Sequence, residues 1–244
     1  MKILLIASVF IPVLFYAQDR FETDIYTTSA GTLKISFIGH GTLMFKLDDL
    51  VIHIDPVMRE TDYRTMPKAD LILVTHHHAD HLDIAAIDHI RKDDTHIIMT
   101  AKCFALLENP GEVEIVRNGD RTTYHNIGIE ALPAYNCIHK RPGGDVFHPK
   151  GEGNGYVLEF GDTRVLVAGD TENIPEIKSL ENIDIAFLPM NLPYTMTPEM
   201  VADAAIAFRP GVLYPYHYGN SDTGKLVELL KEEKDIKVRI MKKK

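Results

Sequence analysis

Cysteine is scarce in this 244-residue chain, which contains only Cys103 and Cys137. Two cysteines are too few for a disulfide framework, and their number also excludes a cysteine-rich zinc site. The sequence does not show whether they pair with each other. Any metal site in this chain is therefore expected to consist of histidine, aspartate and glutamate side chains.

Runs of basic residues are also missing before the C-terminal Lys242-Lys243-Lys244, which we expect to be a solvated end. The formal net charge is −9, whereas a nucleic-acid-binding protein normally needs a basic face that displaces counterions. The composition therefore disfavours a nucleic-acid partner and favours a small-molecule substrate. It leaves the oligomeric state open.

Long apolar runs are confined to the N-terminus, where Lys2 is followed by an apolar stretch over residues 3–17. This stretch is shorter than the roughly 20 apolar residues that span a membrane. A short positive start, a compact apolar region and a small residue at its end are typical of a secretory signal. We therefore predict a signal peptide over residues 1–17 and an exported protein, periplasmic or secreted, with no stable membrane span after cleavage. The alternatives are an uncleaved anchor and a simple N-terminal helix.

Residues 18–244 contain no linker or low-complexity tract, so we expect one domain. Alternating or dense apolar residues predict strands at 33–38, 43–47, 51–54, 71–74, 96–99, 113–116, 127–132, 156–160, 164–167, 185–188, 212–214 and 237–241. Helices are expected at 84–91, 101–107, 175–180, 198–208 and 224–233. Strand-rich blocks that are each followed by helices predict an α/β protein with two packed sheets, covered outside by helices.

The most informative motif, His76-His77-His78-Ala79-Asp80-His81, follows a buried strand. Side chains alternate in an extended chain, so we expect His76 and His78 on one side and His77 on the other. Asp80 and His81 follow as the chain turns toward the next helix. Burying so many ionisable groups together would be costly without a cation. We therefore predict a metal site formed by His76, His78, Asp80 and His81.

Two later strands end in further ligand-type residues. Asp170 follows a strand in Gly169-Asp170-Thr171, and its two carboxylate oxygens are suited to bridging two cations. His217 ends another strand in Tyr214-Pro215-Tyr216-His217. Each motif is unspecific by itself, but beside the histidine cluster both residues become candidate metal ligands.

The order His-x-His-x-Asp-His, Gly-Asp-Thr and a late strand-end histidine resembles the metallo-β-lactamase superfamily over residues 34–219. Ile38-Gly39-His40-Gly41-Thr42, Ile54-Asp55-Pro56 and Tyr214-Pro215-Tyr216-His217 are similar to the branch that contains ascorbate-6-phosphate lactonase and N-acyl-phosphatidylethanolamine phospholipase D. The resemblance implies a metal-dependent hydrolase with the αββα sandwich of that superfamily, in which two mixed β-sheets pack face to face with helices outside.

The resemblance also distributes the ligands between two metal ions. It implies that the first ion is held by His76 and His78, that Asp170 bridges the ions, and that the second is held by Asp80, His81 and His217.

One position departs from the superfamily pattern. Asn136 stands where a further histidine usually binds the first metal ion. His148 in the following loop is the preferred substitute, and His139 is the second candidate. If neither reaches the metal, a single-metal enzyme becomes plausible.

Three residues of the early strands are candidates for supporting roles. His40, between two glycines, is either a turn histidine bonded to backbone or a residue that contacts the substrate or the ligands. His53 is a candidate for orienting a carboxylate or another histidine. Asp55 is expected to hold a ligand histidine in one tautomer.

Imidazole and carboxylate ligands suit one or two Zn²⁺ ions, and the oxygen-rich second site is also suited to Mn²⁺, Fe or Ni²⁺. A metal ion lowers the pKa of bound water to about 7 and so provides hydroxide at neutral pH. We expect this metal-bound hydroxide to attack a carbonyl or phosphoryl centre, oriented by Asp80. The leaving group would be protonated by His40, by His139 or by a metal-bound water.

The expected substrate is a small-molecule lactone, ester or amide. The alternatives are a phosphodiesterase acting on a nucleotide or phospholipid head group, and a non-catalytic metal-binding protein. The Gly- and Pro-rich loop 136–155 and the segment 190–196 are expected to wall the pocket. Lys140 and Arg141 would contact an anionic group there, while Tyr194 and Met196 offer apolar contact.

Overall fold

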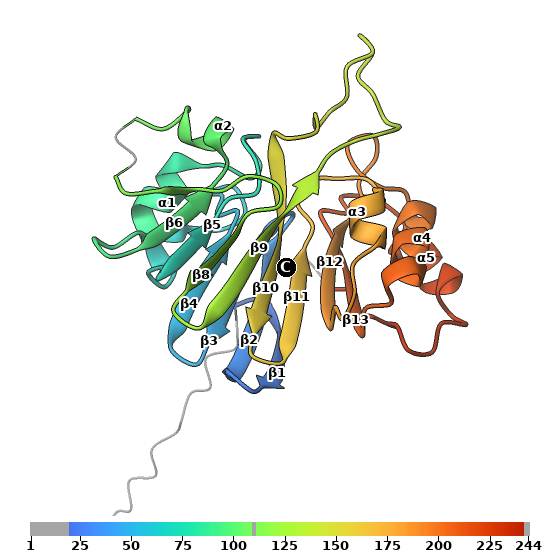
Figure 1. Cartoon of the computed structure of the whole chain (residues 1–244), viewed down its shortest axis with the longest axis horizontal. Coiled ribbons are helices and arrows are strands. Elements are labelled where there is room, and N and C mark those ends of the chain that lie inside the picture. Colours follow the sequence, from blue (N-terminus) through green and yellow to red (C-terminus); the bar gives the residue numbers. More distant parts are fainter. Residues whose placement is uncertain (1–19, 109–110, 242–244) are drawn as a thin grey trace, which may run out of the picture.

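The computed structural model describes residues 20–108 and 111–241, so the predicted signal peptide lies outside the described residues. Two β-sheets face each other, and helices cover the outer face of each sheet (Figure 1). This arrangement confirms the predicted αββα sandwich. Within the described part of the chain, no helix is long and apolar enough to cross a membrane.

The first sheet follows chain order and forms what we call the first half of the protein. Its strands are β1 (Glu22–Thr28), β2 (Gly31–Gly39), β3 (Thr42–Leu47), β4 (Leu50–Ile54), β5 (Leu71–Leu73), β6 (His96–Met99) and β7 (Glu114–Ile115). Strands β1 to β4 pair antiparallel, and β4 to β7 pair parallel. The helical elements of this half are the 3₁₀-helix η1 (Tyr63–Thr65), α1 (Ile84–Ile90) and α2 (Ala101–Phe104).

The second half repeats this plan. Its strands are β8 (Arg121–Tyr124), β9 (Ile127–Ala134), β10 (Gly153–Phe160), β11 (Thr163–Val167), β12 (Ile185–Pro189), β13 (Val212–Tyr216) and β14 (Lys237–Val238). Strands β8 to β11 pair antiparallel, and β11 to β14 pair parallel. Its helices are α3 (Pro175–Lys178), α4 (Pro198–Phe208) and α5 (Thr223–Leu229).

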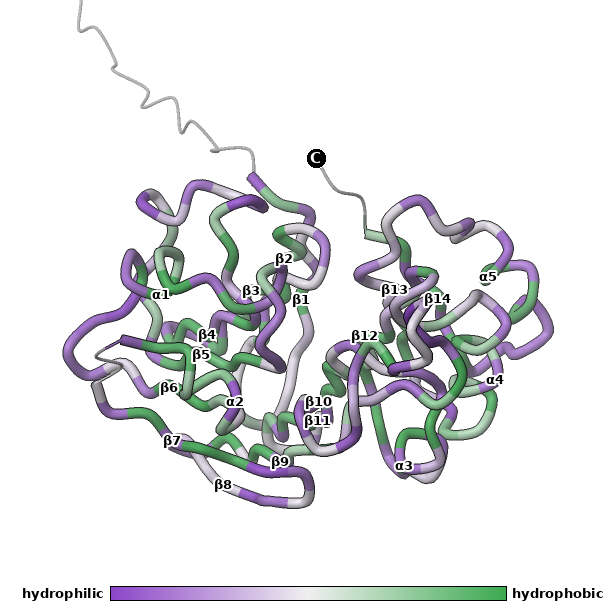
Figure 2. Tube along the Cα trace, turned by 90° about the horizontal axis from the view of Figure 1, so that it is seen from above, coloured by the Kyte–Doolittle hydropathy of each residue, from purple (hydrophilic) through white to green (hydrophobic). Residues whose placement is uncertain are grey.

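Three apolar clusters hold the layers together. The central cluster lies between the sheets and includes Phe45 of β3, Phe160 of β10 and Phe187 of β12. A second cluster joins the outer face of the second sheet to α3, α4 and α5, and a third joins the first sheet to α1. Seen from above, the sheets lie between α1 at one end and α4 and α5 at the other (Figure 2). Each sheet is therefore buried on both faces, as its apolar strands require.

Two strands, β1 and β8, are not predicted from the sequence. Both lie at a sheet edge, and both carry polar, partly exposed residues, so they lack the apolar signal of a buried strand. Other boundaries differ as well: α2, α5 and β14 are shorter than predicted, and β10 already begins at Gly153, inside the predicted loop. The two cysteines are free, Cys103 buried and Cys137 exposed.

Candidate metal centre

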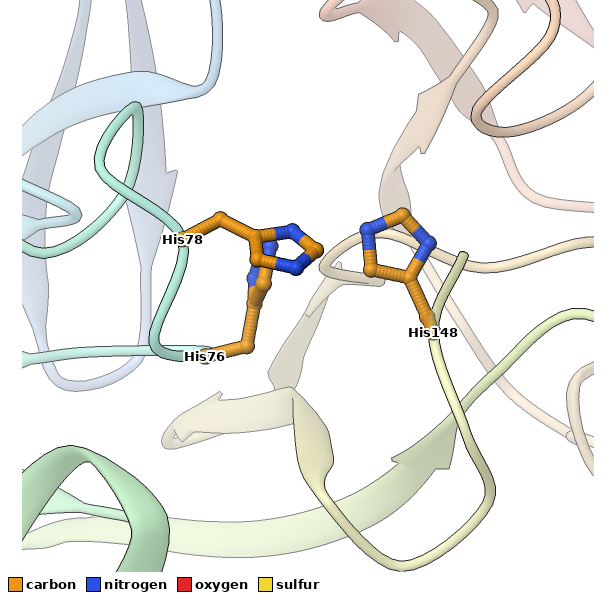
Figure 3. A group of neighbouring side chains, drawn as sticks. All are labelled: His76, His78 and His148. Carbon is orange, nitrogen blue, oxygen red and sulfur yellow. The ribbon is translucent and has the colours of Figure 1, made fainter. Parts of the chain in front are cut away.

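The histidine-rich motif leaves β5 and turns toward α1. His76 and His78 form one group with His148, in which the potential ligand atoms lie within 4.8 Å of one another. In Figure 3, His76 and His78 come from neighbouring positions of one segment, and the ring of His148 faces them from the opposite side. His77 belongs to none of the groups found among residues 20–108 and 111–241, in agreement with the predicted alternation of side chains.

Two further groups adjoin the first. One contains His76, His81 and Asp170, and the other contains His40, Asp80 and His217. The structure thus brings together all the predicted ligands and adds His40 to them. Which of these residues bind metal stays a prediction.

Asp170 lies at the centre of the cluster and is almost completely buried. The carboxylate oxygens of Asp170 lie 3.3 Å from Nε2 of His148, 3.4 Å from Nε2 of both His81 and His217, and 3.9 Å from Nε2 of His76. Burial alone would raise the pKa of Asp170, but the charges of the neighbouring histidines, His217 first among them, hold it well below its usual range. Asp170 therefore offers an ionised carboxylate to both sides of the cluster.

The turn before Asp170 requires glycine. Gly169 has a φ of 65°, and a Cβ atom there would lie 2.6 Å from the backbone oxygen of Asn154. A side chain at this position would therefore be strained and would collide with the neighbouring strand. This close approach explains why the first residue of the Gly-Asp-Thr motif is glycine.

Hydrogen bonds outside the cluster determine how the rings of His76 and His81 are oriented. Asp55, directly after β4, accepts from the backbone N–H and the hydroxyl of Thr75 at 2.8 and 2.7 Å, and from Nδ1 of His81 at 2.7 Å. The Thr75 oxygen in turn accepts from Nδ1 of His76 at 3.0 Å. Both rings consequently carry the proton on Nδ1 and present the Nε2 lone pair to Asp170. The predicted role of Asp55 in holding a histidine tautomer agrees with these contacts.

These orientations fit a metal cation. Among the described residues, five atoms of the cluster residues are buried without a hydrogen-bond partner: Nε2 of His76 and of His81, both ring nitrogens of His217, and Oδ1 of Asp170. Lone pairs that converge on a carboxylate are unfavourable unless a cation lies between them. Burial would lower the pKa of His81, but Asp170 and Asp55 raise it to about 9. The negative charges of Asp170 and Asp55, which favour a proton on His81, equally favour a metal cation beside this ring.

His40 reaches the cluster from the turn between β2 and β3. Its Nε2 lies 3.2 Å from Oδ2 of Asp80, and its ring centroid lies 3.7 Å from that of His217. Burial lowers the pKa of His40 below its ordinary value. Of the two alternatives, the structure thus favours contact with the site over a turn histidine bonded only to backbone.

Three residues at this site have a strained backbone. His40, Asp55 and His217 all have left-handed backbone conformations, with φ of 45°, 47° and 49°. Such conformations cost about 1–3 kcal/mol each in residues other than glycine and are found mainly at functional sites. The backbone N–H of His217 also donates to the carbonyl of His40 at 2.9 Å, which ties the two strained turns together.

The departure at Asn136 has a structural explanation. Asn136 is buried, and its Oδ1 accepts from the backbone N–H of His148 at 2.9 Å and from Nδ1 of His148 at 2.7 Å. Asn136 therefore supports His148 instead of facing the cluster itself. His139, the second candidate, contacts Glu172 at 2.8 Å and lies in none of the ligand groups among the described residues.

Three predicted supporting residues lie away from the centre. His53 donates from Nε2 to the carbonyl of Pro67 and packs against Tyr63, so its predicted role beside a ligand is wrong. Met196 is completely buried in the outer apolar cluster of the second sheet and does not offer a pocket contact. Lys140 is exposed and is not among the residues that line the cavity over the cluster.

A cavity of about 470 Å³ opens over the cluster. Besides ligand candidates it is lined by Arg59, Arg141, Phe147, Asn191 and Tyr194. Arg141 and Tyr194 are therefore placed as predicted. Asn191, in the loop after β12, belongs to the segment 190–196 that is predicted to wall the pocket, whereas Arg59, in the loop after β4, is not predicted from the sequence. The volume of the cavity is within the usual range of small-molecule sites, about 300–1,000 Å³.

An αββα sandwich with clustered histidines and aspartates beside a cavity defines a metallo-β-lactamase-fold protein. The model of the beta-lactamase superfamily domain matches residues 34–217, and the chain therefore belongs to this superfamily.

The chain is also similar to named hydrolases. It is 30% identical over 214 residues to a UPF0173 metal-dependent hydrolase of Koribacter versatilis, which covers 82% of this chain and 91% of the relative. A solved metal-dependent hydrolase from Parabacteroides distasonis is 48% identical, with a TM-score of 0.84 and coverage of 91% of this chain and 98% of that chain. Igni18, a metallo hydrolase from Ignicoccus hospitalis, has the same fold at 22% identity, with a TM-score of 0.71 and coverage of 86% and 95%. The protein is a metal-dependent hydrolase.

Replacing His148 by alanine is expected to lower the metal content of the purified, Zn²⁺-loaded protein from about two ions per chain to about one. The reason is that the group of His76, His78 and His148 would lose one of its three nitrogen ligands. Elemental analysis of metal per chain measures the effect. His89→Ala, at an exposed position of α1 outside the ligand groups of the described residues, is the matched control and should keep the full metal content. An unchanged content in His148→Ala would contradict the assignment.

Proposed function

We propose that this hydrolase cleaves a lactone, ester or amide bond in a small molecule that carries an anionic group, with Zn²⁺ as its metal. The observation that carries the proposal is the cavity over the cluster, which is lined by both the ligand candidates and two arginines, Arg59 and Arg141. The resemblance to the ascorbate-6-phosphate lactonase branch, seen in the segments around His40 and Asp55, supports the same reaction class.

The residues of the cluster have separable roles in this proposal. Three nitrogen ligands, from His76, His78 and His148, would hold one cation, and Asp170 would bridge it to a second. A bound cation lowers the pKa of water and polarises a carbonyl oxygen. For this chemistry to occur, the protein must exclude competing ligands and hold the substrate carbonyl over the cluster.

Asp80 and His40 are the residues we propose for catalysis. The Asp80 carboxylate is partly exposed at the cavity, and its Oδ2 lies 3.2 Å from Nε2 of His40 and 3.6 Å from Nε2 of His217. Asp80 is thus placed to orient an attacking water, and His40 to deliver a proton to the leaving group. Of the two histidines considered for this role, His40 lines the cavity, whereas His139 is not among the residues that line it and bonds to Glu172.

The two arginines indicate an anionic substrate. The chain has a net charge of −9, yet Arg59 and Arg141 both line the cavity. The guanidinium carbon of Arg141 lies 5.0 Å from the centre of the Phe147 ring, and such stacking limits its orientations. Guanidinium groups suit carboxylate or phosphate oxygens, so the anionic group of the substrate would lie on this side.

The test is hydrolysis by the Zn²⁺-loaded protein of paired substrates that differ in one feature. Lactones and esters with and without a carboxylate are compared with a phosphodiester such as bis(p-nitrophenyl) phosphate. We expect turnover of the carboxylate-bearing lactones or esters, and its loss after chelation of the metal. Turnover of the phosphodiester alone would reject the proposal in favour of a phosphodiesterase. No turnover of any substrate by fully loaded protein would contradict it as well.

A phosphodiesterase acting on a nucleotide or phospholipid head group is the second candidate function. The arginine pair is the observation that favours it, because arginine binds phosphate as well as carboxylate. The same substrate panel separates the two functions, since only the bond that is cleaved differs between them.

Replacing Arg141 by glutamine is expected to raise KM for carboxylate-bearing substrates roughly fivefold and to leave kcat nearly unchanged. The magnitude corresponds to an exposed ion pair of about 1 kcal/mol. Kinetics with the charged and neutral members of each substrate pair measure the effect, and the neutral member should not respond. Arg121→Gln, on β8 and paired with Glu130, is the control. An equal effect on both members would show that Arg141 does not contact the anionic group.

We also propose that the protein acts outside the cytoplasm, in the periplasm or after secretion. The support is the apolar stretch over residues 3–17 with a small residue at its end. N-terminal sequencing of the protein from a cell-envelope or culture fraction should find a chain that begins at Gln18. A full-length chain that stays in the cytoplasmic fraction would reject export.

A further inference from the structure

Glu172 is a buried carboxylate two residues after Asp170, and its side chain lies outside the ligand groups. It accepts hydrogen bonds from five N–H groups of a single loop. The donors are Nδ2 of Asn136 at 3.1 Å, the backbone N–H groups of Cys137, Ile138 and His139 at 2.7 Å each, and Nδ1 of His139 at 2.8 Å. A carboxylate has about four lone-pair positions, so this loop fills its acceptor capacity.

Asn136 connects Glu172 to His148. Its Nδ2 donates to Oε1 of Glu172 and, at 2.9 Å, to the carbonyl of Tyr194. Both partners are acceptors only, so the amide nitrogen must face them and Oδ1 must face His148. The amide orientation is thereby determined by its surroundings.

The orientation of Asn136 determines the tautomer of His148. Because Oδ1 of Asn136 can only accept, Nδ1 of His148 must carry the proton in the 2.7 Å contact. The Nε2 lone pair of His148 is then free to point at the cluster, where it lies 3.3 Å from Asp170. Figure 3 shows this ring facing His76 and His78.

His148 lies on the loop between β9 and β10, so its position depends on the contacts that keep this loop ordered. Among the described residues, His148 is the member of the ligand groups that this loop supplies, and its backbone carbonyl accepts from the N–H of Asn136 at 2.9 Å. An ordered loop loses conformational entropy that specific contacts must offset. Glu172 supplies such contacts at the start of the loop, and Asn136 carries them to His148.

We propose that Glu172 is a positioning residue for the first metal ion: through Asn136 it fixes the ring of His148 with Nε2 toward the metal. This inference rests on the proposed role of His148 as a metal ligand. It does not depend on the substrate, because it concerns only the orientation of the His148 ring and the affinity of the protein for metal.

The test is a titration of the metal-free protein with Zn²⁺ in competition with a chromophoric chelator, which resolves the affinities of the two sites. Glu172→Gln keeps the size of the side chain but replaces one acceptor oxygen by an NH₂ group facing N–H donors. We expect the affinity of one site to fall 10- to 100-fold, the usual effect of removing a partner behind a ligand, and the other to stay unchanged. Glu199→Gln is the matched control, because Glu199 lies on α4 and pairs with Lys225 of α5, away from this loop.

A second variant covers the case in which Glu172→Gln does not fold. Asn136→Ala removes the acceptor of His148 but leaves Glu172 its backbone donors, and it should produce the same selective loss of affinity. In folded variants, the NMR signal of the hydrogen-bonded Nδ1 proton of His148 should also be lost. Wild-type affinity at both sites in folded Glu172→Gln or Asn136→Ala would overturn the proposal.

The titration separates this proposal from the proposed function. A selective loss of Zn²⁺ affinity together with no hydrolysis of any substrate would support the positioning role and reject the proposed reaction. An unchanged metal content in His148→Ala would reject the positioning role directly, whatever the substrate.

Discussion

Replacing Asp170 by asparagine is expected to lower kcat/KM by about 10³-fold and to reduce the metal content of the protein. Its two oxygens lie within 3.3–3.9 Å of four histidine nitrogens, so no other carboxylate replaces it at the centre. Asparagine keeps the shape but offers one oxygen and an NH₂ group, which repels a cation. Stabilisation by a catalytic metal is worth several kcal/mol, and each 1.4 kcal/mol or so is a factor of ten.

Steady-state kinetics on the best substrate, with elemental analysis of the same samples, measure this effect. Asp203→Asn is the control, because Asp203 is a carboxylate on α4 that pairs with Lys178 at the surface. Full metal content and a loss of activity below tenfold in Asp170→Asn would show that Asp170 does not bridge metal ions.

Replacing Phe187 by alanine is expected to lower the free energy of unfolding by about 3–5 kcal/mol. Phe187 is completely buried, and its ring stacks on Tyr214 at 4.6 Å and contacts Phe45 of the opposite sheet at 6.0 Å between centroids. A cavity at this place would remove contacts of both sheets at once, and close packing in the interior prevents it from closing completely.

Urea unfolding in the presence of a chelator measures the difference, because bound metal would otherwise add its own stabilisation. Phe187→Leu should cost distinctly less, since it restores part of the lost volume. Ile25→Ala, at a position whose side chain is 66% exposed, should change the free energy by about 0.5 kcal/mol or less. Similar values for Phe187→Ala and Ile25→Ala would mean that the interface between the sheets contributes little.

The fold was predictable where burial leaves a pattern in the sequence. Strands such as β5 and β12 are buried on both faces and consist of continuous apolar residues, and α4 has Thr197 as its N-cap and proline at its first turn. The edge strand β1 is not predicted because most of its residues are polar or partly exposed, so no apolar pattern marks it. Helix ends such as that of α5 depend on tertiary packing and were placed too late.

The site was predictable where ligands follow one another along the chain. His76 and His78 are two residues apart, so their side chains share one direction in an extended segment. The position of His148 beside them depends on a long loop, and spacing alone could not separate His148 from His139. Glu172 directly follows Gly-Asp-Thr, and its position next to this motif is the sequence signal that could have identified it. Its five donors, by contrast, come from the loop after β9 and cannot be seen in the sequence.

The division of the chain into two halves, each forming its own sheet, has a consequence for folding. Within each half, neighbouring strands are neighbours in sequence, so each sheet can form from contacts within its own half before the other sheet is complete. The metal ligand candidates are divided between the halves: His76, His78, Asp80 and His81 come from the first, and His148, Asp170 and His217 from the second. High metal affinity therefore arises only after the halves dock. A bound ion then acts as a cross-link between two folding units, and its removal should increase amide hydrogen exchange first along their shared boundary.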